Sequence, residues 1–187
     1  MKKRDFLKTS ATALSVAFLP KASWALPSQQ RVRTAHIGVG GMGLEDLNAI
    51  ASHPQVTVAA LCDVDQRALD KAHALFPEAK VFKDYREMYA QYASQIDAVV
   101  VSTPDHTHAP ASLMGMEKNK PVYCQKPLTH HVTEARAMKK MAADKNLVTQ
   151  MGIQVHSFYD YKLATQLIQG GIIGKVHTVN AWSNKNW

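Results

Sequence analysis

Three glycines near the start of the chain give the clearest chemical signal in the sequence. Gly38, Gly40 and Gly43 follow the pattern G-x-G-x-x-G. The pattern comes directly after a strand-like run, 32–37, and directly before a segment typical of a helix, 44–52. In such a unit the glycines allow a pyrophosphate to approach the backbone, and the helix N-terminus offers free N–H groups to the phosphates.

An acidic residue stands at the spacing that dinucleotide binding requires. The next apolar run, 56–62, ends in Asp63, about 20 residues after Gly43. A carboxylate at this place can accept hydrogen bonds from the adenosine ribose hydroxyls and would repel a 2′-phosphate. The sequence therefore predicts bound NAD, while Arg67, close by, keeps NADP open.

Polar residues also follow two later apolar runs. The run 96–101 leads into a loop from Ser102 to His108, and the run 121–124 leads into Lys126. Ligands of open α/β sheets bind outside the carboxyl ends of the strands, so both segments are expected at the same edge as the glycines.

The histidines have plainer interpretations beside the functional ones. His106 and His108 either face the ligand or only begin a helix, and their spacing predicts no metal site because no third ligand with suitable spacing stands out. His130 and His131 are interpreted as a helix entry. His156, with Gln154, is either a substrate contact or part of a polar turn between domains.

Alternating strand and helix patterns position these residues. Because short apolar runs alternate with helical periods, the sequence predicts a Rossmann fold, a doubly wound parallel α/β sheet. Cys62 and Cys124 would then lie on strands on opposite sides of the first strand, so no disulfide is expected. The predicted strands are 32–37, 56–62, 80–82, 96–101, 121–124 and 147–150, and the predicted helices are 44–52, 64–76, 84–92, 109–119 and 130–146.

The first residues are predicted to be a targeting segment. Residues 1–25 combine a basic start, a short apolar stretch and a small-x-small cleavage site, followed by a linker at 26–32. Lys3-Arg4 stands where a twin-arginine export signal has two arginines, which favours a periplasmic location and leaves general secretion or a membrane-tethered form open. The alternative is a packed amphipathic helix. The apolar stretch is too short to span a bilayer.

The chain of 187 residues has a net charge of +7, and residues 1–25 contribute more than half of this charge. With no basic stripe and no nucleic-acid motif, a nucleic-acid partner is not expected.

The Rossmann domain is predicted at 33–150. Residues 151–187 change character, with a helix at 158–169 and an alternating strand at 176–182. A lone strand cannot satisfy its edges, so we expect these residues to begin a second domain of a longer protein.

The chain resembles the glucose-fructose oxidoreductase, inositol dehydrogenase and MocA family. The family implies a Rossmann domain followed by an open-faced α/β domain that holds most of the substrate pocket and often a homo-oligomer interface. It also implies that Lys126 is the lysine between nicotinamide and substrate, although the family typically has Glu where this chain has Gln125. The motifs that carry the resemblance are Ile37-Gly-Val-Gly-Gly-Met-Gly43, Cys62-Asp63-Val-Asp65, Ser102-Thr-Pro104-x-His106-x-His108, Gln125-Lys126-Pro127 and Gly171-Ile-Ile-Gly174-Lys175-Val176.

Three hypotheses for function follow. The first is an exported NAD(P)-dependent oxidoreductase that transfers hydride from a sugar or polyol and keeps its nucleotide bound. The second is a redox-neutral glycoside hydrolase that uses the same nucleotide. The third is a non-catalytic nucleotide-binding protein, motivated by Gln125. The catalytic candidate is Lys126, the candidate substrate contacts are Gln154 and His156, and the expected cofactor-binding residues are Gly38, Gly40, Gly41, Met42, Gly43, Asp63, Arg67, Ser102, Thr103, Pro104, His106 and Lys126.

Overall fold

The structure is a computed structural model that describes residues 31–182. The expected signal segment at 1–25 and nearly all of the linker at 26–32 lie outside the described residues. Within the described residues, no helix is both long enough and apolar enough to cross a membrane.

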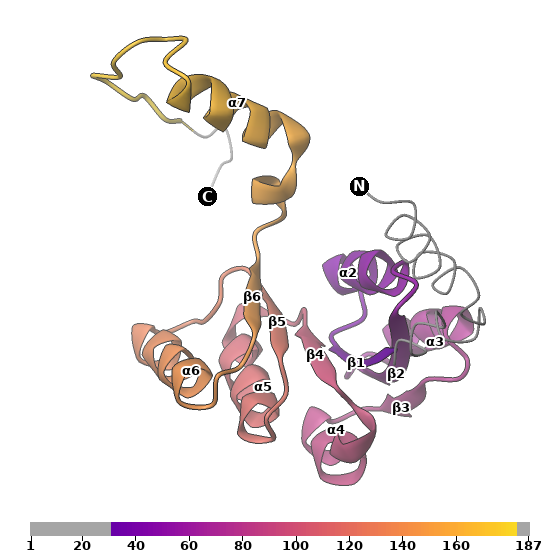
Figure 1. The fold of residues 1–187 in the computed structure, drawn as a ribbon. Coiled ribbons are helices and arrows are strands. Elements are labelled where there is room, and N and C mark those ends of the chain that lie inside the picture. Colours follow the sequence, from indigo (N-terminus) through magenta and orange to yellow (C-terminus); the bar gives the residue numbers. More distant parts are fainter. Residues whose placement is uncertain (1–30, 183–187) are drawn as a thin grey trace, which may run out of the picture.

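A six-stranded parallel sheet forms the centre of the fold (Figure 1). Its strand order, β3-β2-β1-β4-β5-β6, confirms the predicted doubly wound Rossmann topology. The order places the carboxyl ends of β1 and β4 side by side, with Ile37 level with Val101. The strands are β1 Val32–Ile37, β2 Val56–Cys62, β3 Lys80–Phe82, β4 Ala98–Val101, β5 Val122–Gln125 and β6 Thr149–Gly152.

Helices cover both faces of this sheet. On one face, Leu47 and Leu69 pack with Val58 and Leu61 of β2, while on the other Met88 and Met116 belong to the larger core cluster. Apolar, β-branched strands of this kind are typical of a sheet buried on both faces. The helices are α2 Met42–Ala51, α3 Gln66–Leu75, α4 Tyr85–Tyr92, α5 Asp105–Glu117, α6 Val132–Asp144 and α7 Tyr159–Gln169, with short 3-10 turns at Ala93–Gln95 and Gln154–Ser157.

Smaller expectations about these elements are also confirmed. Cys62 on β2 and Cys124 on β5 are buried free thiols on opposite sides of β1. Asp84 caps α4, since its carboxylate accepts a hydrogen bond from the Arg86 backbone N–H. His131 is the N-cap residue of α6, as expected of a helix entry.

Two predicted elements are corrected by the structure. Residues 176–182 do not form the expected strand, because among residues 31–182 they pair with no other strand. Helix α5 begins at Asp105, four residues before the predicted start, so His106 and His108 lie in its first turns, which agrees with the alternative that these histidines begin a helix. Pro110, which normally marks a first turn, lies inside this helix.

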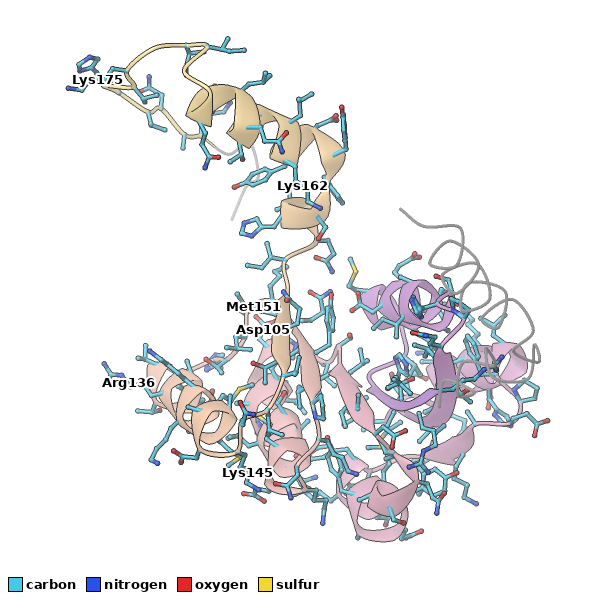
Figure 2. The ribbon with its side chains drawn as sticks, viewed as in Figure 1. Asp105, Arg136, Lys145, Met151, Lys162 and Lys175 are labelled. Atoms are coloured by element: carbon cyan, nitrogen blue, oxygen red, sulfur yellow. The ribbon has the colours of Figure 1, made fainter. Side chains whose placement is uncertain are left out.

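Residues 154–182 extend away from the sheet. Figure 2 shows Met151 at the sheet and Lys162 and Lys175 along the extending arm. The arm contains α7, which confirms the predicted helix at 158–169 to within one residue. Its apolar side chains, Leu167 and Ile168 among them, are largely exposed.

Candidate active site

The glycine turn after β1 fits tightly against the end of β4. Gly38 has a φ of 81°, and a Cβ at this position would lie 2.5 Å from the Ser102 carbonyl oxygen. A Cβ at Gly43 would overlap the Gly38 carbonyl oxygen. Gly40 differs, because its nearest neighbour would be the Ala68 Cβ at 3.2 Å. Gly38 and Gly43 are therefore needed for packing, whereas Gly40 keeps a surface open.

The N-terminus of α2 carries no side-chain cap. Among the described residues, its N-cap position, Gly41, makes no side-chain cap hydrogen bond. The helices α3 and α4 are capped by the carboxylates of Asp65 and Asp84, whereas α5 and α7 also begin without a side-chain cap. The N–H groups of Gly43 and Leu44 donate to the Gly40 and Gly41 carbonyl oxygens, whereas those of Gly41 and Met42 make no hydrogen bond within the described residues. Free N–H groups and the partial positive charge of a helix start behind a glycine turn are what a pyrophosphate needs. The residues present therefore fit a dinucleotide.

Asp63 lies beside this turn at the end of β2. One carboxylate oxygen accepts from the Val39 backbone N–H at 2.8 Å, and the other accepts from the Asp65 N–H at 2.9 Å. Both bonds fix the carboxylate at the mouth of the glycine turn. Arg67 points elsewhere, because its guanidinium pairs with Asp65 at 2.9 Å on the surface.

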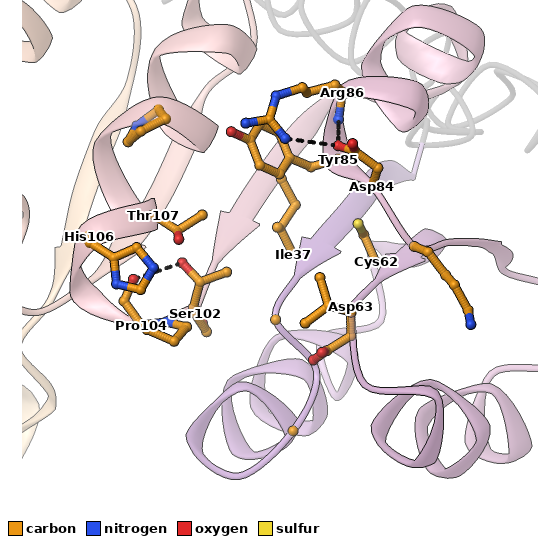
Figure 3. Close-up of a pocket in the computed structure, with 16 residues that line it drawn as sticks. Ile37, Cys62, Asp63, Asp84, Tyr85, Arg86, Ser102, Pro104, His106 and Thr107 are labelled. Atoms are coloured by element: carbon orange, nitrogen blue, oxygen red, sulfur yellow. Dashed lines mark hydrogen bonds and ion pairs between the residues drawn. The ribbon is translucent and has the colours of Figure 1, made fainter.

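A cavity of about 600 Å³ opens at the carboxyl ends of the strands (Figure 3). In the close-up, the loop after β4 lies at the left, Asp84, Tyr85 and Arg86 lie at the top, and Asp63 lies below Ile37 and Cys62. The cavity brings together seven of the predicted cofactor-binding residues. These are Gly38, Gly40, Asp63, Ser102, Thr103, Pro104 and His106.

The loop after β4 is anchored by a buried histidine. The two ring nitrogens of His108 lie 2.7 Å from the Thr103 carbonyl oxygen and 2.6 Å from the Pro127 carbonyl oxygen. His108 is 1% exposed. It therefore joins the cavity loop to the turn that follows β5.

Lys126 belongs to that turn, next to a buried polar network. Its backbone N–H donates to the Gln125 side-chain oxygen at 3.0 Å, and the Gln125 amide nitrogen donates to Asp46 at 3.0 Å. The Ser102 hydroxyl donates to the same Asp46 carboxylate at 2.6 Å. The network connects α2, β4 and β5 directly beneath Lys126.

Several predicted site residues lie outside the cavity lining. Lys126 is exposed after β5, and Gly41 and Met42 are exposed at the start of α2. The Gln154 amide nitrogen lies 3.9 Å from the Met42 sulfur, which brings a predicted substrate contact next to the glycine turn. The other residues outside the lining are Gly43 beneath the turn, Arg67 on α3, and His156, whose ring stacks on Tyr161.

Sequence reasoning missed one wall of the cavity. Lys83, Asp84, Tyr85 and Arg86 follow β3 and line the site. Arg86 lies over the Tyr85 ring, 4.6 Å from its centroid, and its guanidinium pairs with Asp84. The signal was available, because residues after any parallel strand reach the same sheet edge, but β3 has only three residues.

The described residues of this site indicate neither a thiolate nor a metal ion. Burial raises the pKa of the Cys62 thiol to about 12, which keeps it protonated at neutral pH. Among residues 31–182, no three histidine, cysteine, aspartate or glutamate side chains lie close enough together to hold a metal ion.

Residues 32–153 match the GFO/IDH/MocA family, described as an oxidoreductase family with an NAD-binding Rossmann fold. The matched residues run from β1 to the end of β6. They include the glycine turn, Asp63, the loop after β4 and Lys126.

Individual relatives carry more specific names. The chain is 32% identical over 155 residues to an inositol 2-dehydrogenase of Rhodococcus erythropolis, covering 80% of this chain and 43% of the relative. It is 34% identical over 135 residues to a glycosyl hydrolase family 109 protein of Stenotrophomonas maltophilia, covering 67% of this chain and 29% of the relative. The chain therefore spans less than half the length of these curated relatives.

A solved structure matches the fold described above. It is the scyllo-inositol dehydrogenase of Lactobacillus casei with bound NAD(H) and scyllo-inositol, with a TM-score of 0.71 and 25% identity. The match covers 77% of this chain and 42% of that one.

Proposed function

The chain belongs to the glucose-fructose oxidoreductase, inositol dehydrogenase and MocA family, and on that basis we propose that it is the nucleotide-binding part of an NAD-dependent oxidoreductase that acts on a polyol or sugar. The observation that carries the proposal is the glycine turn at the start of α2, with the fixed carboxylate of Asp63 and the cavity beside it. NAD would supply the hydride acceptor when bound.

The chain's own residues divide the work of holding the nucleotide. The N-terminus of α2 and the open surface of Gly40 would receive the pyrophosphate. Asp63 would accept hydrogen bonds from the adenosine ribose hydroxyls, which favours NAD over NADP. Thr103, Pro104 and His106 on the loop after β4 would line the path toward the nicotinamide.

Lys126 would act on the substrate. Its place at the end of β5, next to the strand that carries the Ser102 loop, puts a cation on the same edge as the cavity. There its ammonium group would orient a substrate hydroxyl and stabilise oxyanion character as the proton leaves. Gln154, beside Met42, and His156 would line the substrate side.

The test is chemical analysis of bound nucleotide. The whole protein would be purified, dialysed extensively and denatured, and the released nucleotide identified by mass spectrometry. About one NAD per chain supports the proposal, as does a rise in reduced nicotinamide when inositols or sugars are added. If no nucleotide is released and none binds at millimolar concentration, the chain has a non-catalytic role instead.

Redox-neutral glycoside hydrolysis is the second candidate, favoured by the 34% identity to a glycosyl hydrolase family 109 protein. Transient oxidation of the sugar would acidify the neighbouring C–H, the aglycone would be eliminated, water would add, and the carbonyl would be reduced again. Release of an aryl alcohol from an aryl glycoside without accumulation of reduced nicotinamide would favour this candidate. Net reduction of NAD by a free polyol would favour the dehydrogenase.

We also propose export and a second domain. The basic, apolar and small-x-small pattern at 1–25 supports a periplasmic protein that crosses the membrane with its nucleotide bound. Residues 151–187 would begin a substrate domain, which would also carry a homo-oligomer interface. Sequencing the N-terminus of the protein from a periplasmic fraction tests the cleavage near Ala25.

A further inference from the structure

A buried carboxylate lies under the strand ends that carry the candidate site. Asp46 on α2 is 6% exposed, and Gln125 at the end of β5 is 4% exposed. A buried charge is costly unless hydrogen bonds satisfy it. Asp46 is satisfied by the Ser102 hydroxyl at 2.6 Å and by the Gln125 amide nitrogen at 3.0 and 3.3 Å.

The orientation of Gln125 is determined on both sides. A carboxylate only accepts hydrogen bonds, so the Gln125 nitrogen must face Asp46. Its oxygen then faces the Lys126 backbone N–H, 3.0 Å away, which can only donate. The amide is therefore a fixed bridge from Asp46 to the backbone of Lys126.

We infer that Asp46 is a positioning residue for Lys126, acting through the Gln125 amide. Since Asp46 lies on α2, one turn after Gly43, the same helix that presents its N-terminus to the phosphates also fixes the lysine. The inference rests on the proposed function for the role of Lys126. It also explains Gln125, because a Glu at this position would put two buried carboxylates in contact.

Exchange of the two functional groups tests the bridge in the whole protein. Gln125→Glu opposes two carboxylates, and Asp46→Asn brings a new NH2 group within reach of the Gln125 NH2 group, where both can only donate. The double variant restores a donor and an acceptor. The amide introduced at position 46 would accept a hydrogen bond from the Ser102 hydroxyl and donate one to the carboxylate introduced at position 125. That carboxylate would in turn accept a hydrogen bond from the Lys126 backbone N–H.

A matched pair of substitutions controls for the chemistry of the exchange. It is Gln66→Glu with Asp70→Asn, on the exposed face of α3, where the amide nitrogen and the carboxylate oxygen lie 2.8 Å apart. These variants make the same change of functional groups far from Lys126. We expect them to leave both readouts below unchanged.

Two readouts follow the lysine itself. The first is hydrogen exchange of the Lys126 backbone amide, measured by NMR without nucleotide. Exchange of the Lys126 amide is compared with exchange of amides in the centre of β4. We expect it to accelerate about tenfold or more in Gln125→Glu and by a smaller factor in Asp46→Asn, and to slow again in the double variant.

The second readout is kcat with the polyol substrate. We expect Gln125→Glu to lower kcat by about tenfold to a hundredfold with little change in the KM for NAD, and the double variant to recover most of the loss.

Other outcomes would overturn the inference. If Lys126 exchange is unchanged in Gln125→Glu, or the double variant is no better than the worse single variant, the bridge does not position the lysine. If only unfolding stability recovers and kcat does not, the pair has a purely structural role. If the wild-type protein binds no NAD, the proposed function fails, while the exchange measurement still decides whether Asp46 holds Lys126.

Discussion

At the residue scale, the choice of nucleotide depends on Asp63. Its carboxylate is fixed at the glycine turn by the N–H groups of Val39 and Asp65. We expect Asp63→Asn to weaken NAD binding about tenfold or more, because hydrogen bonds to a charged acceptor are lost. The preference for NAD over NADP should also become smaller, because the carboxylate that repels the 2′-phosphate of NADP is gone. Calorimetric titration with both nucleotides measures this change. The exposed Asp70→Asn on α3 is the control, and equal losses in the two variants would argue against the assignment of Asp63.

Lys126 is the second residue whose role can be isolated. Its side chain is exposed and does not line the cavity, so we expect its removal to disturb the residues that would hold most of the nucleotide very little. We expect Lys126→Met in the whole protein to lower kcat by about a hundredfold or more while NAD affinity changes little. Steady-state kinetics and NAD titration separate these effects, with Lys118→Met on the surface as control. Unchanged turnover would remove the catalytic assignment.

At the scale of elements, substitutions of Gly43 and Gly40 in the turn should have different effects, one on stability and the other on NAD affinity. A Cβ at Gly43 overlaps the Gly38 carbonyl oxygen, so Gly43→Ala should force β1 and α2 apart and lower the unfolding temperature. A Cβ at Gly40 lies 3.2 Å from the Ala68 Cβ, which can yield by a few tenths of an ångström. Gly40→Ala should therefore fold almost normally but lose NAD affinity, because the methyl group occupies the surface that the pyrophosphate approaches.

Thermal unfolding and NAD titration of both variants test this distinction. Loss of stability of the same size in both would show that Gly40 is needed for packing as well. Normal NAD binding by Gly40→Ala would contradict the proposed pyrophosphate surface.

The same scale shows what the sequence could predict. Strands β1 and β2 and the start of α4 were predicted correctly, because apolar runs and the Asp84 cap are local signals. The predicted start of α5 was four residues too late, because local pattern does not show the tertiary contacts that His108 makes with Thr103 and Pro127. The Asp46–Gln125 contact could not be predicted, since it joins residues far apart in the sequence.

At the scale of the whole molecule, the sheet was predictable and the arm after it was not. The alternation at 176–182 indicates one apolar face, but pairing depends on a partner strand that local pattern does not supply. Residues 31–182 offer it no such partner. A pattern of period two therefore predicts which side chains would share a face, whereas the strand itself depends on contacts elsewhere.

The acid stability of the whole fold should depend on His36, at the centre of β1. Its ring is completely buried, one nitrogen lies 3.0 Å from the Thr34 hydroxyl, and the other has no hydrogen-bond partner within residues 31–182. Burial lowers the pKa of His36 from 6.5 to about 3. Between these values the unfolded chain binds a proton that the folded chain excludes, so the free energy of unfolding falls as the pH falls, by roughly 1.4 kcal/mol per pH unit.

Denaturant unfolding between pH 6.5 and 4.5 measures this slope. Asp97 does not titrate in this pH range, because its hydrogen bond with Arg33 holds its pKa below the usual value. Its contribution to the free energy of unfolding is therefore lost only at lower pH. We expect His36→Met to flatten the slope by about one proton, because no buried imidazole then resists protonation. Exposed His53→Gln is the control. If the slope is the same in His36→Met and in the wild-type protein, the acid sensitivity comes from groups other than His36.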